Sequence, residues 1–252
     1  NFLYFQFLVF ENQIKYIKWL HDKKERNESN SFLVEWAKSL IELLSSDFKI
    51  EILVISESFF IKNRNLVSKY TFEILKPEEI TKLSTLSHNS DGIAVVKQIQ
   101  NWELKNNWSE IILVLDEIKD PGNLGTITRI ADWYGISKII ASENTCEFYN
   151  PKVIISTMWS FSRVQIFYTD LGKYLQNENL PIYGAFMDWE NIHNITFDKK
   201  WGFLVIGNES NGIWKEIEKY ITKKITIPRF WWAESLNAWV ATAVILDNMK
   251  RK

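Results

Sequence analysis

The sequence predicts an α/β protein with a parallel sheet flanked by helices, preceded by a smaller α/β domain. Short apolar runs alternate with amphipathic helical patterns along residues 111–252. This alternation is typical of a parallel sheet that is covered on both faces. Apolar residues make up 46% and charged residues 24% of the chain, as in ordinary globular proteins. A length of 252 residues allows one large or two ordinary domains.

Composition excludes several classes of protein. No apolar run approaches the roughly 20 residues needed to span a bilayer, so we expect no membrane partner. The single cysteine, Cys146, excludes an internal disulfide framework and fits a reducing cytoplasm, where we expect the protein. With three histidines and one cysteine we expect no metal cofactor. The net charge of −1 does not favour nucleic acid, although local patches decide such binding.

The first ten residues, NFLYFQFLVF, are apolar but lack a basic start and a small-residue cleavage site. They therefore do not predict a signal peptide. Because LYFQ resembles a protease-site remnant, we expect residues 1–10 to be a tag remnant or disordered.

Residues 11–98 predict the smaller domain. Pro77 with two acids directly after it is a normal helix start. Residues 99–110 are polar and without periodicity, so we expect a linker there. The expected elements of this domain are a helix over 12–24, strands over 31–35, 49–56, 70–75 and 92–98, and helices over 37–46 and from Pro77.

Residues 111–252 predict the larger domain, and its strand-end loops are where a ligand is expected, because parallel sheets bind ligands at the carboxyl ends of their strands. The expected strands cover residues 110–118, 138–142, 163–169, 181–187, 202–209 and 223–229. The expected helices begin near 123, 150, 171, 212 and 235.

The first of these loops begins with Asp120-Pro121-Gly122-Asn123, a turn signal that leads into a helix. Gly122, Gly125, Thr126 and Arg129 then fall on one helical stripe. A helix N-terminus attracts anions, and an arginine adds a bidentate grip. The alternative is a tight turn followed by a solvated arginine.

The second loop, FLVIGNESNGI, has Gly207 and Gly212 around Glu209, which allows close backbone approach to a ligand. Glu209 either orients a positive group or caps the next helix. In the third loop the strand stops at Pro228 and Ser235 is the expected N-cap of the last helix. Ser235 and Asn237 either contact a ligand or, in the case of Ser235, serve only as a cap.

Together, DPGNLGTITR, IGNESNGI and IPRFWWAESLNAWVATAV resemble the three motifs of the SpoU/TrmH family of RNA ribose 2′-O-methyltransferases. This resemblance covers residues 111–252. Upstream, KKERNESNSFLVEWAKSL resembles the start of the RNA-binding domain that often precedes the catalytic domain, with a ribosomal-protein-like α/β fold. The resemblance implies a SPOUT fold with a C-terminal trefoil knot, a homodimer, and an RNA substrate, either rRNA or tRNA.

The resemblance also implies site residues. Asn123 and Arg129 match the first motif and Glu209 the second. Arg129 would orient the target phosphate or 2′-OH, with Asn123 and Glu209 orienting Arg129 or the substrate. Ser235 and Asn237 match the third motif. S-adenosylmethionine would be held, without a metal, by the loops at Ala185, Gly207, Ile227, Ser235, Leu236 and Asn237.

RNA contact is expected from basic residues of the smaller domain, with Lys23, Lys24 and Arg26 as candidates. The alternative for each of the three is a solvated surface charge.

The chain departs from the family at tryptophans that stand where the family commonly has glycine. One such exchange costs about 1–3 kcal/mol by overpacking alone. Either the letters do not report the natural residues, or the chain is an altered member, a non-catalytic RNA-binding protein whose cofactor pocket Trp231 and Trp232 fill. An unrelated nucleotide-binding enzyme is disfavoured because a P-loop and GxGxxG are both missing. The positions are Trp36, Trp159, Trp189, Trp231, Trp232 and Trp239.

Overall fold

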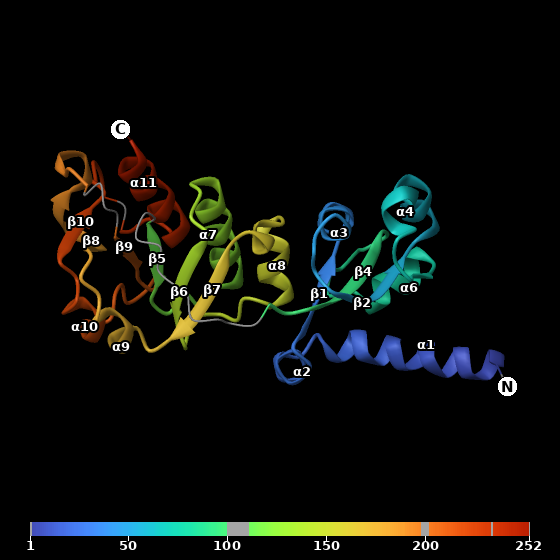
Figure 1. Ribbon diagram of the computed structural model, residues 1–252. Coiled ribbons are helices and arrows are strands. Elements are labelled where there is room, and N and C mark those ends of the chain that lie inside the picture. The colour runs from blue at the N-terminus through green and yellow to red at the C-terminus, as the bar shows by residue number, and fades with distance from the viewer. Residues whose placement is uncertain (1, 100–110, 198–201, 233, 252) are drawn as a thin grey trace. The chain divides into compact units, whose positions relative to one another are not determined.

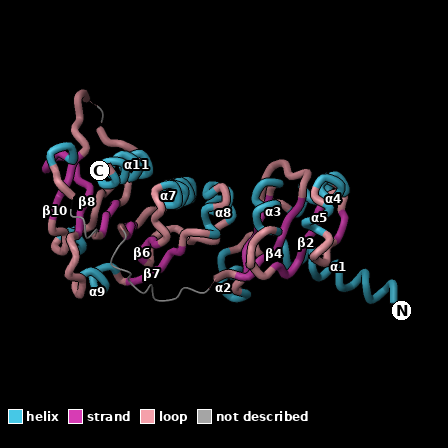
Figure 2. The backbone as a smooth tube through the Cα atoms, turned by 45° about the horizontal axis from the view of Figure 1, so that its top comes forward, coloured by secondary structure: helices cyan, strands magenta, loops and turns pink. Residues whose placement is uncertain are grey.

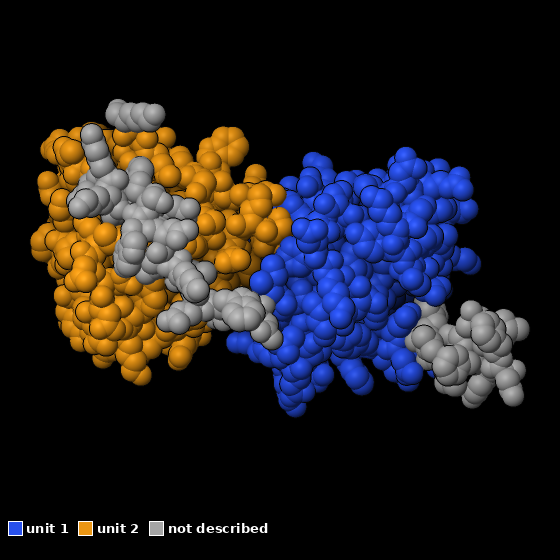
Figure 3. All heavy atoms as spheres, viewed as in Figure 1, with its two compact units in different colours: residues 1–100, 149–159 blue, residues 101–148, 160–252 orange. Residues whose placement is uncertain are grey.

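The computed structural model describes residues 2–99, 111–197, 202–232 and 234–251 (Figure 1). The chain divides into two compact units, residues 1–100 with 149–159 and residues 101–148 with 160–252 (Figure 3). The segment 149–159 thus groups with the first unit, which the sequence did not predict. Apart from its first residue, the predicted linker lies outside the described residues.

The first unit contains a mixed four-stranded sheet in the order β1-β4-β2-β3. Strand β4 runs antiparallel to both β1 and β2, whereas β3 runs parallel to β2. Its strands are β1 (Ser31–Glu35), β2 (Ile50–Ile55), β3 (Glu73–Ile74) and β4 (Gly92–Lys97). Its helices are α1 (Phe2–Trp19), α2 (Lys23–Ser29), α3 (Ala37–Leu44), α4 (Glu57–Lys62), α5 (Arg64–Val67), α6 (Pro77–Leu83) and α8 (Pro151–Thr157).

The beginning of the chain differs from the prediction. Residues 2–10 form the start of α1, and the expectation that they are a tag remnant stays a prediction. The single helix expected over 12–24 is two helices, because Asp22 accepts a hydrogen bond from the backbone N–H of Lys24 at 2.7 Å and so begins α2. The buried residues Ile17 of α1 and Leu20, which directly follows that helix, pack on one face of the sheet with Leu33 and Val95.

Two tryptophans of the first unit adopt backbone conformations that favour glycine. Trp36, between β1 and α3, has φ 77° and ψ 141°. Trp159, which follows α8 and Met158, has φ 94°. A side chain at positive φ is strained because its Cβ crowds the backbone, and the region of Trp36 is close to one populated almost only by glycine. Both positions are therefore glycine positions by their backbone geometry.

The second unit contains a six-stranded sheet in the order β10-β8-β9-β5-β6-β7, and every neighbouring pair is parallel. This confirms the predicted parallel sheet. Its strands are β5 (Ile112–Leu115), β6 (Lys138–Ser142), β7 (Gln165–Thr169), β8 (Ile182–Asn191), β9 (Phe203–Ile206) and β10 (Lys223–Thr226). Its helices are α7 (Pro121–Trp133), α9 (Leu171–Leu175), α10 (Lys215–Glu218) and α11 (Ala238–Lys250), with short 3₁₀ turns at Ser160–Ser162 and Ile192–Asn194.

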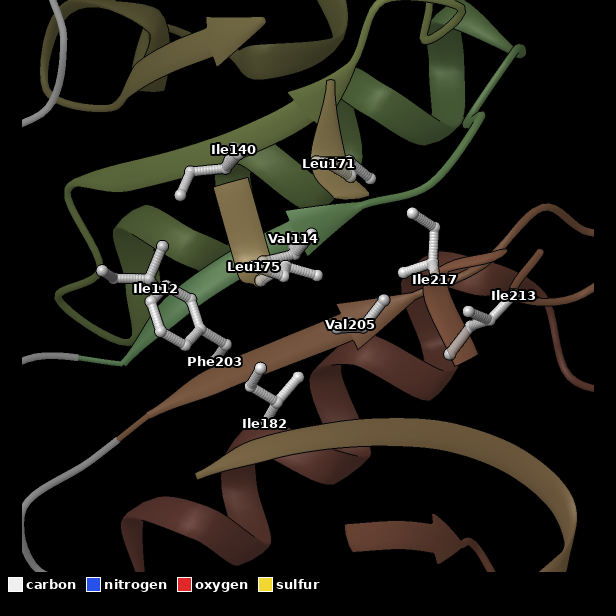
Figure 4. Packing of buried hydrophobic residues seen from close by; sticks show 10 residues of the cluster. All are labelled: Ile112, Val114, Ile140, Leu171, Leu175, Ile182, Phe203, Val205, Ile213 and Ile217. Atoms are coloured by element: carbon white, nitrogen blue, oxygen red, sulfur yellow. The ribbon is translucent and has the colours of Figure 1, made fainter. Parts of the chain in front are cut away.

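Helices cover both faces of this sheet (Figures 1 and 2). On one face, Leu171 and Leu175 of α9 and Ile217 of α10 pack on alternate residues of the strands, including Val114 and Val205 (Figure 4). On the other face, α7 and α11 pack against each other. The alternation arises because successive side chains of a strand point to opposite faces. The knot that the resemblance implies stays a prediction.

Candidate active site

The strand register brings the predicted cofactor loops to one edge of the second unit's sheet. Gly184 of β8 pairs with both Val205 of β9 and Lys224 of β10. Thr226 at the end of β10 pairs with Asn191 at the end of β8, and β9 ends one residue after Val205. The carboxyl ends of the three parallel strands therefore lie at the same edge of the sheet. Gly207 and Ile227 directly follow β9 and β10, whereas Ala185 lies within β8, directly after Gly184.

Asn123 and Glu209 meet across the first two loops. The Asn123 side-chain Nδ2 donates to Glu209 Oε1 at 2.5 Å, although 86 residues separate them. Asn123 occupies the first turn of α7, where its backbone N–H donates to the capping carboxylate of Asp120 at 2.8 Å. The structure thus brings together two of the predicted catalytic residues and fixes the amide end of the pair by a helix cap.

Arg129 is not held by this pair. It lies six residues further along α7, about 9 Å along the helix axis, and its side chain is exposed. Within the part of the chain that the structure describes, the side chain of Arg129 forms no hydrogen bond or ion pair. In the single chain Asn123 and Glu209 bond to each other, and the expectation that they orient Arg129 or the substrate stays a prediction. A free, exposed guanidinium can bind an anion from outside the chain.

Asn237, and not Ser235, is the N-cap of α11. Its side-chain oxygen accepts a hydrogen bond from the backbone N–H of Trp239 at 3.1 Å. The predicted helix start at Ser235 is thus two residues early, because asparagine caps a helix as well as serine does. Ser235 and Leu236 are exposed in the loop that leads to the cap.

The tryptophans of the third loop do not fill a pocket. Trp231 is 81% exposed and Trp232 is 88% exposed. Trp189, at the end of β8, is 56% exposed and Trp239 is 38% exposed. The structure therefore gives no support to a chain whose cofactor site is blocked by these side chains.

A buried polar network at the end of β5 bonds to the loop that contains Glu209. It was not predicted from the sequence. Asp116 and Glu117 directly follow β5 and are 3% and 8% exposed. Burial raises the pKa of Asp116 above its ordinary value. Hydrogen bonds from Asn144 and Lys119 lower the pKa of Glu117. Two acids at the carboxyl end of a predicted buried strand were the available signal.

Glu117 makes a prediction about acid stability. Because its folded-state pKa lies below the ordinary 4.5, the stability it contributes is present above pH 4.5 and is lost as the pH falls through the folded-state pKa. Glu117→Gln should lower the free energy of unfolding at pH 7 by about 1–3 kcal/mol and flatten its decline below pH 4.5. Thermal unfolding midpoints between pH 3 and 7 measure both effects. An unchanged acid decline would contradict the assigned pKa direction.

The predicted RNA contacts in the first unit divide into two kinds. Lys23 and Lys24 are exposed at the start of α2. Arg26 is 2% exposed, and its Nη1 donates to the backbone carbonyls of Leu20 and His21 at 2.8 Å each. Arg26 therefore completes the hydrogen bonding at the end of α1 and does not reach RNA, which corrects the prediction.

Among the described residues, no helix is both long and apolar enough to cross a bilayer. The same residues include no group of three or more His, Cys, Asp or Glu side chains that could hold a metal ion.

Residues 110–247 match the family model of the SpoU rRNA methylases. The chain belongs to the SpoU rRNA methylase family. Residues 11–94 of this SpoU protein also match the family model of the MRM3-like substrate binding domain.

Several known proteins resemble this SpoU protein over nearly its whole length. The 23S rRNA (guanosine(2553)-2′-O)-methyltransferase RlmP of Bacillus subtilis is 26% identical, over 94% of this chain and 96% of that protein. A structure from Porphyromonas gingivalis, described as an RNA methyltransferase of the TrmH family, is 29% identical with a TM-score of 0.83, over 94% of this chain and 96% of that one. The SpoU methyltransferase AviRb of Streptomyces viridochromogenes, solved with AdoMet, shares the fold at 20% identity and a TM-score of 0.81, over the same shares of the two chains.

Proposed function

We propose that this SpoU protein transfers the methyl group of S-adenosylmethionine to a ribose 2′-OH of ribosomal RNA. The observation that carries the proposal is the Asn123–Glu209 hydrogen bond at the strand-end edge of the sheet. It joins two loops that match the family's motifs. Transfer RNA is the alternative substrate. The likeness to a 23S rRNA methyltransferase over 96% of that protein's length favours ribosomal RNA.

The strand-end edge fits the cofactor. Three adjacent strands end side by side there, and the loops after them contain Gly207 and the exposed Ser235 and Leu236. Backbone groups of these loops, with those at Ala185 and Ile227, would hold S-adenosylmethionine, and Asn237 would keep the third loop attached to α11. When bound, the cofactor supplies an electrophilic methyl group. The chain's task is then to place the 2′-OH about 3 Å from that carbon and in line with the bond that breaks.

The three polar residues of the first two motifs divide this task. Arg129 is exposed, and a guanidinium group offers only hydrogen-bond donors. It binds the phosphate next to the target ribose and does not remove the proton. Asn123 and Glu209 present a fixed amide and carboxylate that orient the substrate. The carboxylate of Glu209 accepts a hydrogen bond from the 2′-OH and takes up its proton as the methyl group is transferred to the oxygen.

A homodimer explains the distance between these groups. Arg129 lies about 9 Å along α7 from the Asn123–Glu209 pair, so one chain alone does not bring all three together. We propose that a second copy of the chain completes the site, in the cytoplasm where the lone Cys146 stays reduced. Sedimentation at micromolar concentration should show a dimer, and a monomer under all conditions would contradict this part.

The exposed lysines of α2 are proposed RNA contacts. Lys23→Ala with Lys24→Ala should weaken RNA binding and reduce the slope of log Kobs against log salt by about 0.7 for each phosphate of a single strand that is no longer neutralised. Lys173→Ala with Lys215→Ala, two exposed lysines of the second unit, is the charge-matched control. An unchanged salt slope in the α2 variant would count against this surface.

Cofactor binding tests the proposed function most cheaply. Calorimetric titration of the chain with S-adenosylmethionine should give a dissociation constant in the micromolar range, about −8 kcal/mol. Absence of binding at millimolar cofactor would overturn the proposal.

A further inference from the structure

Two adjacent acidic residues, Asp116 and Glu117, follow the carboxyl end of β5. Asp116 bonds to the residues just before and just after the second-motif loop, residues 207–213, and Glu117 bonds to Asn208 within it. We infer that they are positioning residues, which hold this loop so that Glu209 meets Asn123. The inference rests on the proposed function, because it assigns a role in that reaction to residues that touch no substrate.

Asp116 binds the chain on both sides of the loop. Its backbone N–H donates to the carbonyl of Ile206 at 2.9 Å, immediately before the loop. Its carboxylate Oδ2 accepts from the backbone N–H of Trp214 at 2.8 Å, immediately after the loop. A single buried residue thus fixes the distance between the loop's two ends.

Glu117 bonds to a residue within the loop. Its backbone carbonyl accepts a hydrogen bond from Asn208 Nδ2 at 2.9 Å. The other end of the same Asn208 amide, Oδ1, accepts from the backbone N–H of Ser210 at 2.9 Å and of Asn211 at 3.2 Å. Glu209 lies between these bonded residues. Its backbone is therefore held through both neighbours, and the Asn208 amide connects them to the carbonyl of Glu117.

The conformation of Glu117 is itself maintained by several contacts. Its φ is 55°, an uncommon value for a residue other than glycine. Its N–H donates to Ser142 Oγ at 2.9 Å, and its carboxylate accepts from Asn144 Nδ2 at 2.8 Å and lies 3.1 Å from Lys119 Nζ. Such strained conformations persist only where the surroundings over-determine them, and they cluster at functional sites.

The loop has little freedom of its own. Asn208 and Gly212 exchange backbone hydrogen bonds of 3.0 and 2.9 Å, and Gly212 has φ 68°. A Cβ added at Gly207 would lie 2.2 Å from the backbone carbon of Gly212. The loop is therefore closed by its own backbone contacts. Its position is set by its attachments, and the exposed Asn123–Glu209 bond contributes little to it, because water competes for both groups.

The decisive comparison is between two substitutions of Asp116. Asp116→Ala removes the acceptor of the Trp214 N–H and should lower kcat by about 10–100-fold, because small displacements of positioning groups cost that much, with KM for RNA nearly unchanged. Asp116→Asn keeps a side-chain oxygen in that place and should restore kcat to within about threefold. Asn208→Ala, which removes the link to Glu117, should resemble Asp116→Ala, and it serves as the second test where Asp116→Ala does not fold.

Asp132→Ala is the matched control. Asp132 accepts hydrogen bonds from Ser160 Oγ at 2.8 Å and from Arg163, far from the loop along α7. It should lower the melting temperature without lowering kcat below that temperature. Full kcat in Asp116→Ala and Asn208→Ala, an equally low kcat in Asp116→Asn, or an equal loss in Asp132→Ala would each overturn the positioning role.

Hydrogen exchange separates this inference from the proposed function. The backbone amides of Ser210, Asn211 and Trp214 should exchange faster in Asp116→Ala than in Asp132→Ala, whether or not the chain methylates RNA. If the unsubstituted chain methylates no RNA, the proposed function fails while the exchange result still decides the positioning role.

Discussion

Replacing Arg129 with alanine should lower kcat/KM for methyl transfer by about 100-fold or more. The reason is that a preorganised charge next to the reacting group contributes about 10²–10³ to catalysis when it stabilises the transition state. Arg129→Lys should recover only part of the loss, because an ammonium lacks the bidentate fork of a guanidinium. Initial rates of methyl incorporation into RNA at saturating S-adenosylmethionine measure both variants.

The control for Arg129 is Arg163→Ala. Arg163 is also an exposed arginine of the second unit, but it is paired with Asp132 at 2.6 Å. Its loss should leave the rate within about threefold, since exposed ion pairs contribute about 0–1 kcal/mol. Equal rates for Arg129→Ala and the unsubstituted chain would remove Arg129 from the site.

The second large effect concerns the two tryptophans at positive φ. At positions 36 and 159 the glycine variant should be more stable than the alanine variant by about 1–3 kcal/mol, because alanine keeps the strained Cβ and glycine does not. Comparing glycine with alanine removes the indole from both variants. The contact between Trp159 and the Phe48 ring, with centroids 6.4 Å apart, therefore cancels. Chemical denaturation of the four single variants gives the two differences.

Trp133 is the control position. It ends α7 with its side chain 85% exposed, at a residue without positive φ. At position 133 the free energy of unfolding of the alanine variant should exceed that of the glycine variant by about 0.5–1 kcal/mol, which is the ordinary order within a helix. The same order at positions 36 and 159 would contradict the strain that we assign to them.

The backbone geometry bears on the two interpretations of the tryptophans. A conformation that favours glycine at Trp36 and Trp159 favours glycine as the natural residue there. Intact mass of the chain purified from its source decides this directly, because each glycine lowers the mass by about 130 Da through loss of the indolylmethyl group. The exposed Trp231 and Trp232 are compatible with the same interpretation, since their rings do not pack into the core.

Local patterns in the sequence predicted the elements of the fold well. The strands at Ser31–Glu35 and Lys138–Ser142 begin and end as expected, and the sheet of the second unit is parallel throughout. These features depend on hydrophobic periodicity within a few residues. The helix starts at Asp22 and Asn237 were missed because several polar residues in succession were able to cap, and only backbone geometry selects one.

The candidate site was predicted as a set of residues but not as an arrangement. Motif resemblance pointed to Asn123 and Glu209, which the structure joins. The buried Asp116 and Glu117 escaped notice, because their partners Trp214 and Asn208 lie 98 and 91 residues away. Arg26 looked like a surface charge for a different reason, since its partners are close in sequence but their carbonyls become available only because α1 ends at Trp19.

The most direct test of the proposed function is methyl transfer from labelled S-adenosylmethionine into separated rRNA and tRNA, followed by nucleoside analysis. We expect a 2′-O-methylated nucleoside in rRNA with the unsubstituted chain, and a strong reduction with Arg129→Ala. Label in tRNA alone would correct the substrate. Label on a base, or none in either pool from a chain that binds the cofactor, would contradict ribose 2′-O-methylation.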